Sequence, residues 1–418
     1  MNTTMTNIFP NIPTTLPSKS ELPQGTSRMI WKWSFPKDRL GKTVMVEGVE
    51  YKKLLTLDLN IPESEFAEKV NGAPLGQAES TFSANYPCPH KCPGCFNNAK
   101  LHNPILTLEE VWGIVDQALQ LGLESVKFLG PGELIANPKL FEILDGFLNR
   151  NIVVGIFTKG AVLGNDMLSY HYHSISSKEL TERLVSYPNV TLLVGGRSFD
   201  PHYENLFIPR NGEIIEEGFD YHEARGIALE RLCKAGMNTD LEKPRLAIIC
   251  SPVTFQNLGC VGEIYKWGAE RNIPVYLPPT MVSGKGHSLV KKALDKKFED
   301  DYIKLAVEVY LWAIERGIMT LEQFTAEGPH PYIGVAPCNQ LTHGMYIHYD
   351  GTVQRCPGND TLDFIVHPNV RTAPLREIWR NSKNYTVNQF NNGCVKDGVS
   401  LPKRFYGEVR ARILAKQQ

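Results

Sequence analysis

The chain has 418 residues, a formal net charge of −1, 42% hydrophobic residues and 21% charged residues. This length exceeds what one small core can bury and fits a large domain with an appendage. The balanced charge argues against a nucleic-acid or anionic-membrane partner that is held by bulk charge. No apolar run is long enough for a membrane span and the first residues lack signal-peptide features, so we expect a cytoplasmic protein.

Residues 1–25 are rich in Pro, Ser, Thr and Asn and predict a flexible lead-in. A small N-terminal extension is expected over 26–80, where short apolar alternations between 29 and 61 indicate β-structure. From residue 81 the pattern alternates between strands and helices. The expected strands are 81–86, 125–129, 152–157, 190–194, 245–250 and 273–277. The expected helices are 107–121, 138–149, 177–186, 222–235, 261–271 and 289–316.

The helix expected at 107–121 carries the clearest local signals. Thr107 and Glu110 form a capping box, and Gly122 follows the last apolar position. Six β/α units in series favour a parallel sheet with right-handed crossovers. Periodicity alone leaves open whether that sheet is a partial barrel or an open doubly wound sheet. The alternation ends near residue 320, where we expect a domain boundary.

Nine cysteines in a long chain without a secretion signal favour thiolate ligands over a disulfide framework. Cys88, Cys92 and Cys95 crowd one loop that is bent by prolines and a glycine. Soft sulfur ligands select zinc, copper(I) or iron–sulfur clusters. A closed zinc site needs a fourth ligand, for which only His90 or His102 is nearby, whereas three cysteines suffice for a cubane with one open iron. The three cysteines between the two sets are expected to be core thiols: Cys233, Cys250 and Cys260.

The pattern CxxxCxxC after a predicted strand resembles the radical S-adenosylmethionine (SAM) superfamily. The resemblance implies that the three cysteines hold a [4Fe–4S] cluster whose open iron binds SAM. An electron, from a reductant such as flavodoxin or ferredoxin, then yields a 5′-deoxyadenosyl radical that abstracts hydrogen from the substrate. The string CPHKCPGCFN is most similar to activating enzymes of glycyl-radical proteins. It departs from many members at Gly94, where they carry an aromatic residue.

Further motifs similar to those of the superfamily follow the later strands in order. The string GPGE at 130–133 resembles the GGE motif that binds the cofactor's amino group, with Pro131 as a departure. Ser198 matches the serine that meets the ribose, and Arg225 matches the arginine that pairs with the cofactor carboxylate. All lie at the carboxyl ends of predicted strands, where parallel folds bind ligands. A plain turn, a helix cap and a solvated arginine are the alternatives. The implied cofactor-binding residues are Gly130, Gly132, Glu133, Thr158, Ser198, Arg225 and Asn257.

The second cysteine set lies late in the chain. Cys338 and Cys356 flank a predicted hairpin with its turn at 348–351. Their spacing resembles the Twitch/SPASM auxiliary-cluster domains, in which Cys394 would be a third ligand of a second [4Fe–4S] cluster. The fourth ligand is open: Asp360, Asp397, a histidine or the substrate. Three ordinary buried cysteines are the alternative.

The resemblance therefore implies an α/β fold. It comprises a partial (β/α)6 TIM-type barrel over 81–320 and a small C-terminal α+β auxiliary-cluster domain over 321–418. The leading function is a radical SAM enzyme that matures a peptide or other natural product by a crosslink, an epimerisation or an oxidation. The alternatives are a radical dehydrogenase or epimerase of a small molecule such as a sugar, nucleotide or amino acid, a glycyl-radical activase, and a non-catalytic metal-binding scaffold. A scaffold would leave the ordered motifs after the strands unexplained.

Overall fold

A computed structural model describes Ile12 and residues 41–59, 88–95, 105–129, 132–209, 218–281, 283–286, 296–334, 343–354, 356–357, 368–381 and 400–417. Its centre is an eight-stranded sheet of order β10-β9-β3-β4-β5-β6-β7-β8. The strands of this sheet are β3 (Thr56–Leu59), β4 (Ser125–Phe128), β5 (Val153–Thr158), β6 (Val190–Gly195), β7 (Leu246–Ile249), β8 (Val275–Tyr276), β9 (Gly344–Ile347) and β10 (Val353–Gln354).

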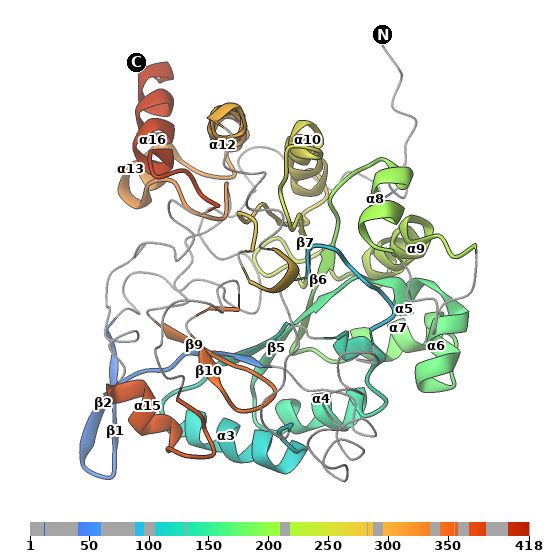
Figure 1. Cartoon of the computed structure of the whole chain (residues 1–418), viewed down its shortest axis with the longest axis vertical. Coiled ribbons are helices and arrows are strands. Elements are labelled where there is room, and N and C mark those ends of the chain that lie inside the picture. The colour runs from blue at the N-terminus through green and yellow to red at the C-terminus, as the bar shows by residue number, and fades with distance from the viewer. Residues whose placement is uncertain are drawn as a thin grey trace.

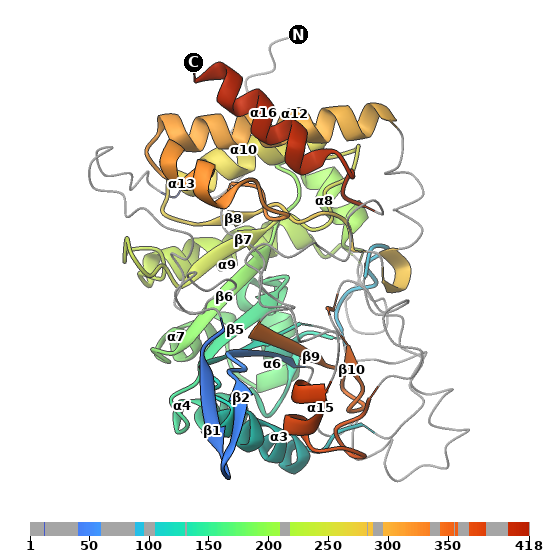
Figure 2. The same cartoon turned by 90° about the vertical axis from the view of Figure 1, so that its left-hand side faces the viewer.

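The six strands from β3 to β8 are all parallel, which confirms the predicted six-unit α/β fold. Strand β9 runs parallel to β3 on its other side, and β10 is antiparallel to β9. No pairing between β8 and β10 closes the sheet within the described residues, so the barrel is partial. Figure 2 shows the strands fanning from β9 and β10 to β8.

Helices cover the outer face of the sheet in an arc from α3 through α4, α7 and α9 to α10 (Figure 1). The main core lies between these helices and the sheet, and among the described helices none is long and apolar enough to cross a membrane. The helices are α3 (Leu108–Gln120), α4 (Leu140–Leu148), α5 (Ala161–Gly164), α6 (Asp166–His173), α7 (Ser177–Val185), α8 (Pro201–Phe207), α9 (Tyr221–Lys234), α10 (Leu258–Ala269), α12 (Lys296–Glu315), α13 (Leu321–Glu327), α15 (Leu375–Asn381) and α16 (Phe405–Lys416), with the short 3₁₀ turns η2 (Leu134–Ala136) and η3 (Gly284–Gly286).

The predicted capping box on α3 is confirmed. The Thr107 side chain accepts from the Glu110 amide at 3.2 Å, and the Glu110 carboxylate accepts from the Thr107 amide at 2.7 Å. Gly122 follows the helix with φ of 89°, in the left-handed region that favours glycine. Local sequence therefore sets both ends of this helix.

The position of the first strand is a correction. Strand β4 pairs with β3 on one side and β5 on the other, so residues 56–59 occupy the place that we expected for 81–86. Residues 81–87 lie outside the described part of the chain. Asp58 interrupts the apolar run of β3, so the periodicity of this short segment does not distinguish a barrel strand from part of a small extension. The β-structure expected before it is present as the hairpin of β1 (Thr43–Val46) and β2 (Val49–Lys52).

The C-terminal segment is joined to the barrel by main-chain pairing. Strand β9 extends the parallel sheet, and the Trp379 indole on α15 donates to the Lys52 carbonyl at 2.6 Å. The predicted hairpin turn is confirmed, since Gly351 donates to the His348 carbonyl at 2.8 Å between β9 and β10. A domain boundary near residue 320 stays a prediction. Strand β9 lies after this position in the chain but belongs to the same sheet as the barrel strands.

Ile12 departs from the flexible lead-in that composition predicts. Its side chain is buried in the main core, and its carbonyl accepts from Arg271 Nε at 2.9 Å. One buried apolar residue hardly changes the average composition of a polar segment, so composition does not predict the burial of Ile12.

Candidate functional site

The structure describes all three cysteines of the first loop. The Cys95 amide donates to the Cys92 carbonyl at 3.2 Å, which bends the loop at its CPGC end. Burial raises the pKa of the Cys88 thiol, and the neighbouring Cys92 raises it further. The protein alone therefore disfavours a thiolate at Cys88, and a bound metal centre would supply the charge that stabilises one.

Among the described residues, no group of three His, Cys, Asp or Glu side chains is already placed to hold a metal ion. The ligands of one zinc ion all bind the same atom, whereas the three cysteines of a cubane each bind a different iron of one cluster. His90 is not a zinc ligand in this arrangement: its ring packs edge-on against Tyr221 at 5.2 Å between centroids.

His90 is a buried, neutral imidazole within the loop. Burial lowers its pKa to about 3, and the cations of Lys159 and Arg197 act in the same direction. Neither ring nitrogen has a hydrogen-bond partner among the described residues. The ends of β5 and β6, which carry Lys159 and Arg197, therefore lie close to the cysteine loop.

Glu133 lies at the end of the segment that leaves β4. It is 9% exposed, its Oε2 accepts from the Lys159 amide at 2.9 Å, and its Oε1 has no partner within the described residues. Burial raises the pKa of Glu133, against hydrogen bonds from Lys159 and Thr158. Thr158 also accepts from the Gly160 amide at 2.8 Å, and Gly160 has φ of 80°. The structure thus brings together Glu133 and Thr158 as predicted, while Gly130 lies outside the described residues and Gly132 has φ of 81°.

A buried triad of two arginines and one glutamate lies at the end of β6. Glu204 Oε2 is 3.0 Å from Arg197 Nη2 and 3.0 Å from Arg225 Nη1, and all three side chains are at most 1% exposed. Burial alone would raise the pKa of Glu204, but the two guanidinium groups hold it at about 2. The two guanidinium groups therefore hold Glu204 as a buried anion.

Ser198 and Asn257 are already engaged within the protein. Ser198 Oγ accepts from the Asp200 amide at 3.0 Å, which fixes the start of α8. The Asn257 amide group donates to the carbonyls of Arg197 and Pro252, and its oxygen accepts from the Thr254 amide at 2.7 Å. Asn257 therefore holds two strand-end loops together, and its side-chain hydrogens are not available to a cofactor in this arrangement.

A short bridge links the two cysteine sets. The Lys285 amide in η3 donates to the Cys95 carbonyl at 2.9 Å, and Ser283 Oγ donates to the Pro357 carbonyl at 3.0 Å. Pro357 directly follows Cys356, which is partly exposed. The remaining predicted ligands Cys338 and Cys394 lie outside the described residues. Residues 283–286 therefore contact both cysteine segments.

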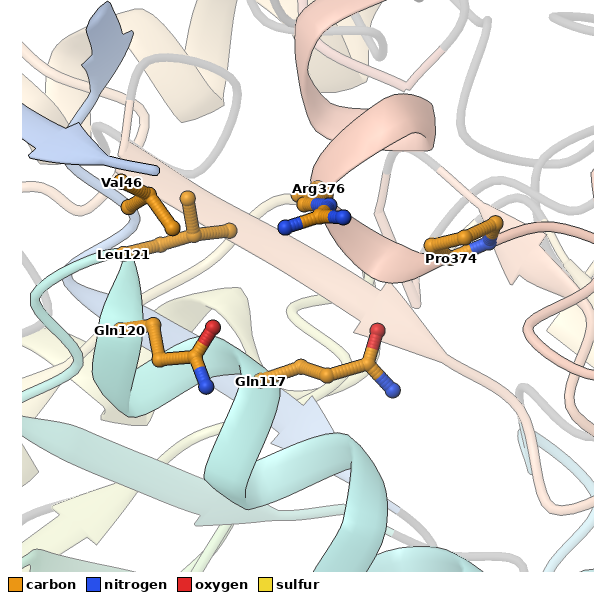
Figure 3. Close-up of a pocket in the computed structure, with 6 residues that line it drawn as sticks. All are labelled: Val46, Gln117, Gln120, Leu121, Pro374 and Arg376. Carbon is orange, nitrogen blue, oxygen red and sulfur yellow. The ribbon is translucent and has the colours of Figure 1, made fainter. Parts of the chain in front are cut away.

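A cavity of about 190 Å³ lies elsewhere, between α3, β1 and α15 (Figure 3). Arg376 faces Gln117 and Gln120 across it, and the Gln117 side chain accepts from the Leu375 amide at 3.0 Å. None of the predicted site residues lines it. This cavity separates packed elements and is not part of the candidate site.

Sequence reasoning missed Arg197, Glu204 and the bridging role of Lys285. Arg197 directly precedes Ser198 at a strand end, which is a usable signal. Glu204 offers none, because its role depends on α8 packing against the end of β6. The triad could be found only once those elements were placed.

Comparisons with known proteins agree with this geometry. Residues 338–398 match SPASM, described as an iron–sulfur cluster-binding domain. A structure named native anSMEcpe with bound AdoMet superposes with a TM-score of 0.52 at 16% identity, over 87% of this chain and 98% of that one. SuiB from Streptococcus suis bound to precursor peptide SuiA superposes with a TM-score of 0.50 at 15% identity, over 83% of this chain and 69% of that one.

No curated protein matches the sequence. SuiB bound to S-adenosylmethionine gives a TM-score of 0.50 at 16% identity, over 80% of this chain and 67% of that one. The chain therefore shares the fold of these solved structures, and its residues 338–398 match the SPASM iron–sulfur cluster-binding domain.

Proposed function

We propose that this protein is a radical SAM enzyme that modifies a peptide, with one [4Fe–4S] cluster on Cys88, Cys92 and Cys95 and a second bound by the SPASM segment. When bound to the first cluster, SAM supplies a 5′-deoxyadenosyl radical for hydrogen abstraction. The observation that carries the proposal is the buried Glu133 carboxylate beside the cysteine loop, whose Oε1 has no partner among the described residues. This carboxylate and the guanidinium groups of Arg197 and Arg225 match in sign the two charged ends of an amino-acid moiety.

The residues present fit the cofactor. Glu133 offers a buried carboxylate oxygen, Oε1, that has no partner among the described residues and suits an ammonium group. The two guanidinium groups of the Arg197–Glu204–Arg225 triad are donors of the kind that suits a carboxylate. Gly160 brings the backbone after β5 close to the same end of the sheet. Ser198 and Asn257 position these loops.

The second cluster is proposed on Cys356 with Cys338 and Cys394. The bridge at 283–286 contacts both Cys95 and the residue after Cys356, which supports two centres on the same side of the barrel. A second centre there would accept an electron from a substrate radical or bind the substrate.

A peptide substrate is supported by the fold shared with SuiB, which was determined with precursor peptide SuiA bound. The test uses the reconstituted protein with SAM, a reductant and the short peptide encoded nearest to its gene. A crosslink or oxidation would remove two hydrogen atoms from the peptide, and an epimerisation in heavy water would add deuterium. Formation of 5′-deoxyadenosine without any change in the peptide would favour a small-molecule substrate, and a glycyl radical on a partner protein would favour an activase.

The cluster assignment is tested separately by counting iron and sulfide after anaerobic reconstitution. Changing Cys88, Cys92 and Cys95 together to Ala should lower iron from about eight to about four per chain and abolish 5′-deoxyadenosine. Cys233→Ala is the matched control, because this thiol lies on α9 and burial raises its pKa to about 12. Zinc without iron, and no cofactor cleavage, would refute the proposal and leave a metal-binding scaffold.

A further inference from the structure

His90 lies in the middle of the cysteine loop, two residues after Cys88 and two before Cys92. Its side chain is 5% exposed, and neither ring nitrogen has a hydrogen-bond partner among the described residues. A neutral imidazole carries one N–H donor and one acceptor nitrogen. A buried donor without an acceptor costs about 1–3 kcal/mol, so this ring is a poor choice for a position that only needs to be filled.

The described neighbours of the ring offer no acceptor for its N–H. Tyr221 packs edge-on against it at 5.2 Å between centroids, and Phe219 lies tilted at 6.3 Å. The Tyr221 hydroxyl is engaged elsewhere, since it donates to the Gly195 carbonyl at 3.2 Å and accepts from Arg197 Nη2 at 3.2 Å. Lys159 and Arg197, whose charges act on the ring, are donors only. These contacts therefore leave the N–H for another group.

The loop holds His90 close to the sulfur atoms of Cys88 and Cys92. Burial raises the pKa of the Cys88 thiol, and a hydrogen bond from the His90 main chain opposes this effect. Burial also raises the pKa of Tyr221 to about 12, and Cys92 is among the charges that raise it further. An electrostatic interaction also links Cys92 to Arg197. Since Tyr221 and Arg197 are neighbours of the His90 ring as well, the ring and the Cys92 sulfur share the same surroundings.

Aromatic packing alone does not explain an imidazole at this position. A phenylalanine ring would keep the contacts with Tyr221 and Phe219 without burying a polar group that lacks a partner. The cluster proposed above would bring acceptors into the loop, because its sulfides and cysteine thiolates carry negative charge. Hydrogen bonds to such sulfurs raise the reduction potential of a cluster, since they stabilise its more negative, reduced state.

We infer that the His90 ring N–H donates to a sulfur of the cluster held by Cys88, Cys92 and Cys95 and raises its reduction potential. The residue tunes electron transfer to the cluster and takes no part in hydrogen abstraction. The inference rests on the proposed function only in taking the metal group to be an iron–sulfur cluster.

The test is an anaerobic redox titration of the reconstituted protein, followed by electron paramagnetic resonance. The signal of the first cluster is the one that disappears when Cys88, Cys92 and Cys95 are changed to Ala. His90→Phe keeps a ring and removes the N–H, so its cluster should be reduced about tenfold less favourably, which is a midpoint about 59 mV lower for one electron. His90→Asn restores an amide N–H, and its midpoint should lie above that of the Phe variant. His171→Phe is the matched control with a wild-type midpoint, because His171 is exposed on α6.

A second measurement detects the hydrogen bond directly. In protein labelled with ¹⁵N-histidine, pulsed electron paramagnetic resonance of the reduced first cluster should show a weak ¹⁵N coupling. The coupling should persist in His171→Phe and disappear in His90→Phe. If the His90 variants fail to bind iron, its presence or absence in the wild type decides the question.

A wild-type midpoint in His90→Phe, or no ¹⁵N coupling in the wild type, would overturn the inference. A cluster with the coupling in a protein that forms no 5′-deoxyadenosine would refute the proposed function and leave the inference standing. Zinc without iron would refute both.

Discussion

Replacing Glu204 with Gln tests the buried charge triad most directly. The Glu204 side chain is fully buried against Arg197 and Arg225, and its pKa is lowered from 4.5 to about 2. A depression of this size corresponds to about 3 kcal/mol of stability that is present above the ordinary carboxyl pKa. That contribution is lost as the pH falls from about 4.5 towards 2. At neutral pH the Gln variant leaves two cations without their anion and should lose about 3–5 kcal/mol.

The assay is anaerobic urea denaturation followed by circular dichroism, with Glu263→Gln as the control. Glu263 pairs with Lys266 on the surface of α10 with 54% of its side chain exposed, so its loss should cost at most about 1 kcal/mol. The double variant Arg197→Met and Glu204→Leu should be less destabilised than the sum of its two single variants, because it removes both charges of one pair. A Glu204→Gln protein within about 1 kcal/mol of the wild type would refute this account of the triad.

Further predictions concern the helices and the second cluster. Thr107→Ala removes the capping box of α3 and should lower the free energy of unfolding by about 1 kcal/mol in urea denaturation. Gly164→Ala should prevent folding or severely destabilise the protein, because a Cβ there would lie 1.7 Å from the Ala224 carbonyl oxygen. Recovery of the variant as soluble protein in normal yield would contradict this close packing of α5 against α9. Gly113→Ala should instead stabilise the protein by about 0.5–1 kcal/mol, because Gly113 lies in α3 and the new Cβ meets nothing within 4 Å. Cys356→Ser should remove about four irons and leave the electron paramagnetic resonance signal of the first cluster; unchanged iron would exclude Cys356 as a ligand.

The sequence by itself determined the features that depend on neighbouring residues. The capping box at Thr107 and Glu110, the turn before Gly351, and the five strands and five helices predicted between residues 107 and 277 follow from local hydrogen bonding and from periodicity over a few turns. The short helices α5, α6 and α8 were not predicted. The spacing of Cys88, Cys92 and Cys95 indicated a metal loop for the same reason. Their assignment to a cluster stays a prediction.

Only the tertiary structure decided which distant segments meet. Strand β3 occupies the place expected for 81–86, and β9 joins it from the other end of the chain, because strand partners are chosen by packing and not by position in the sequence. The pairing of Glu204 with two arginines, the bridge from Lys285 to Cys95, and the buried ion pair of Asp58 with Lys127 are likewise long-range. Local patterns cannot specify these contacts, because burial and electrostatic environment arise only when the elements are assembled.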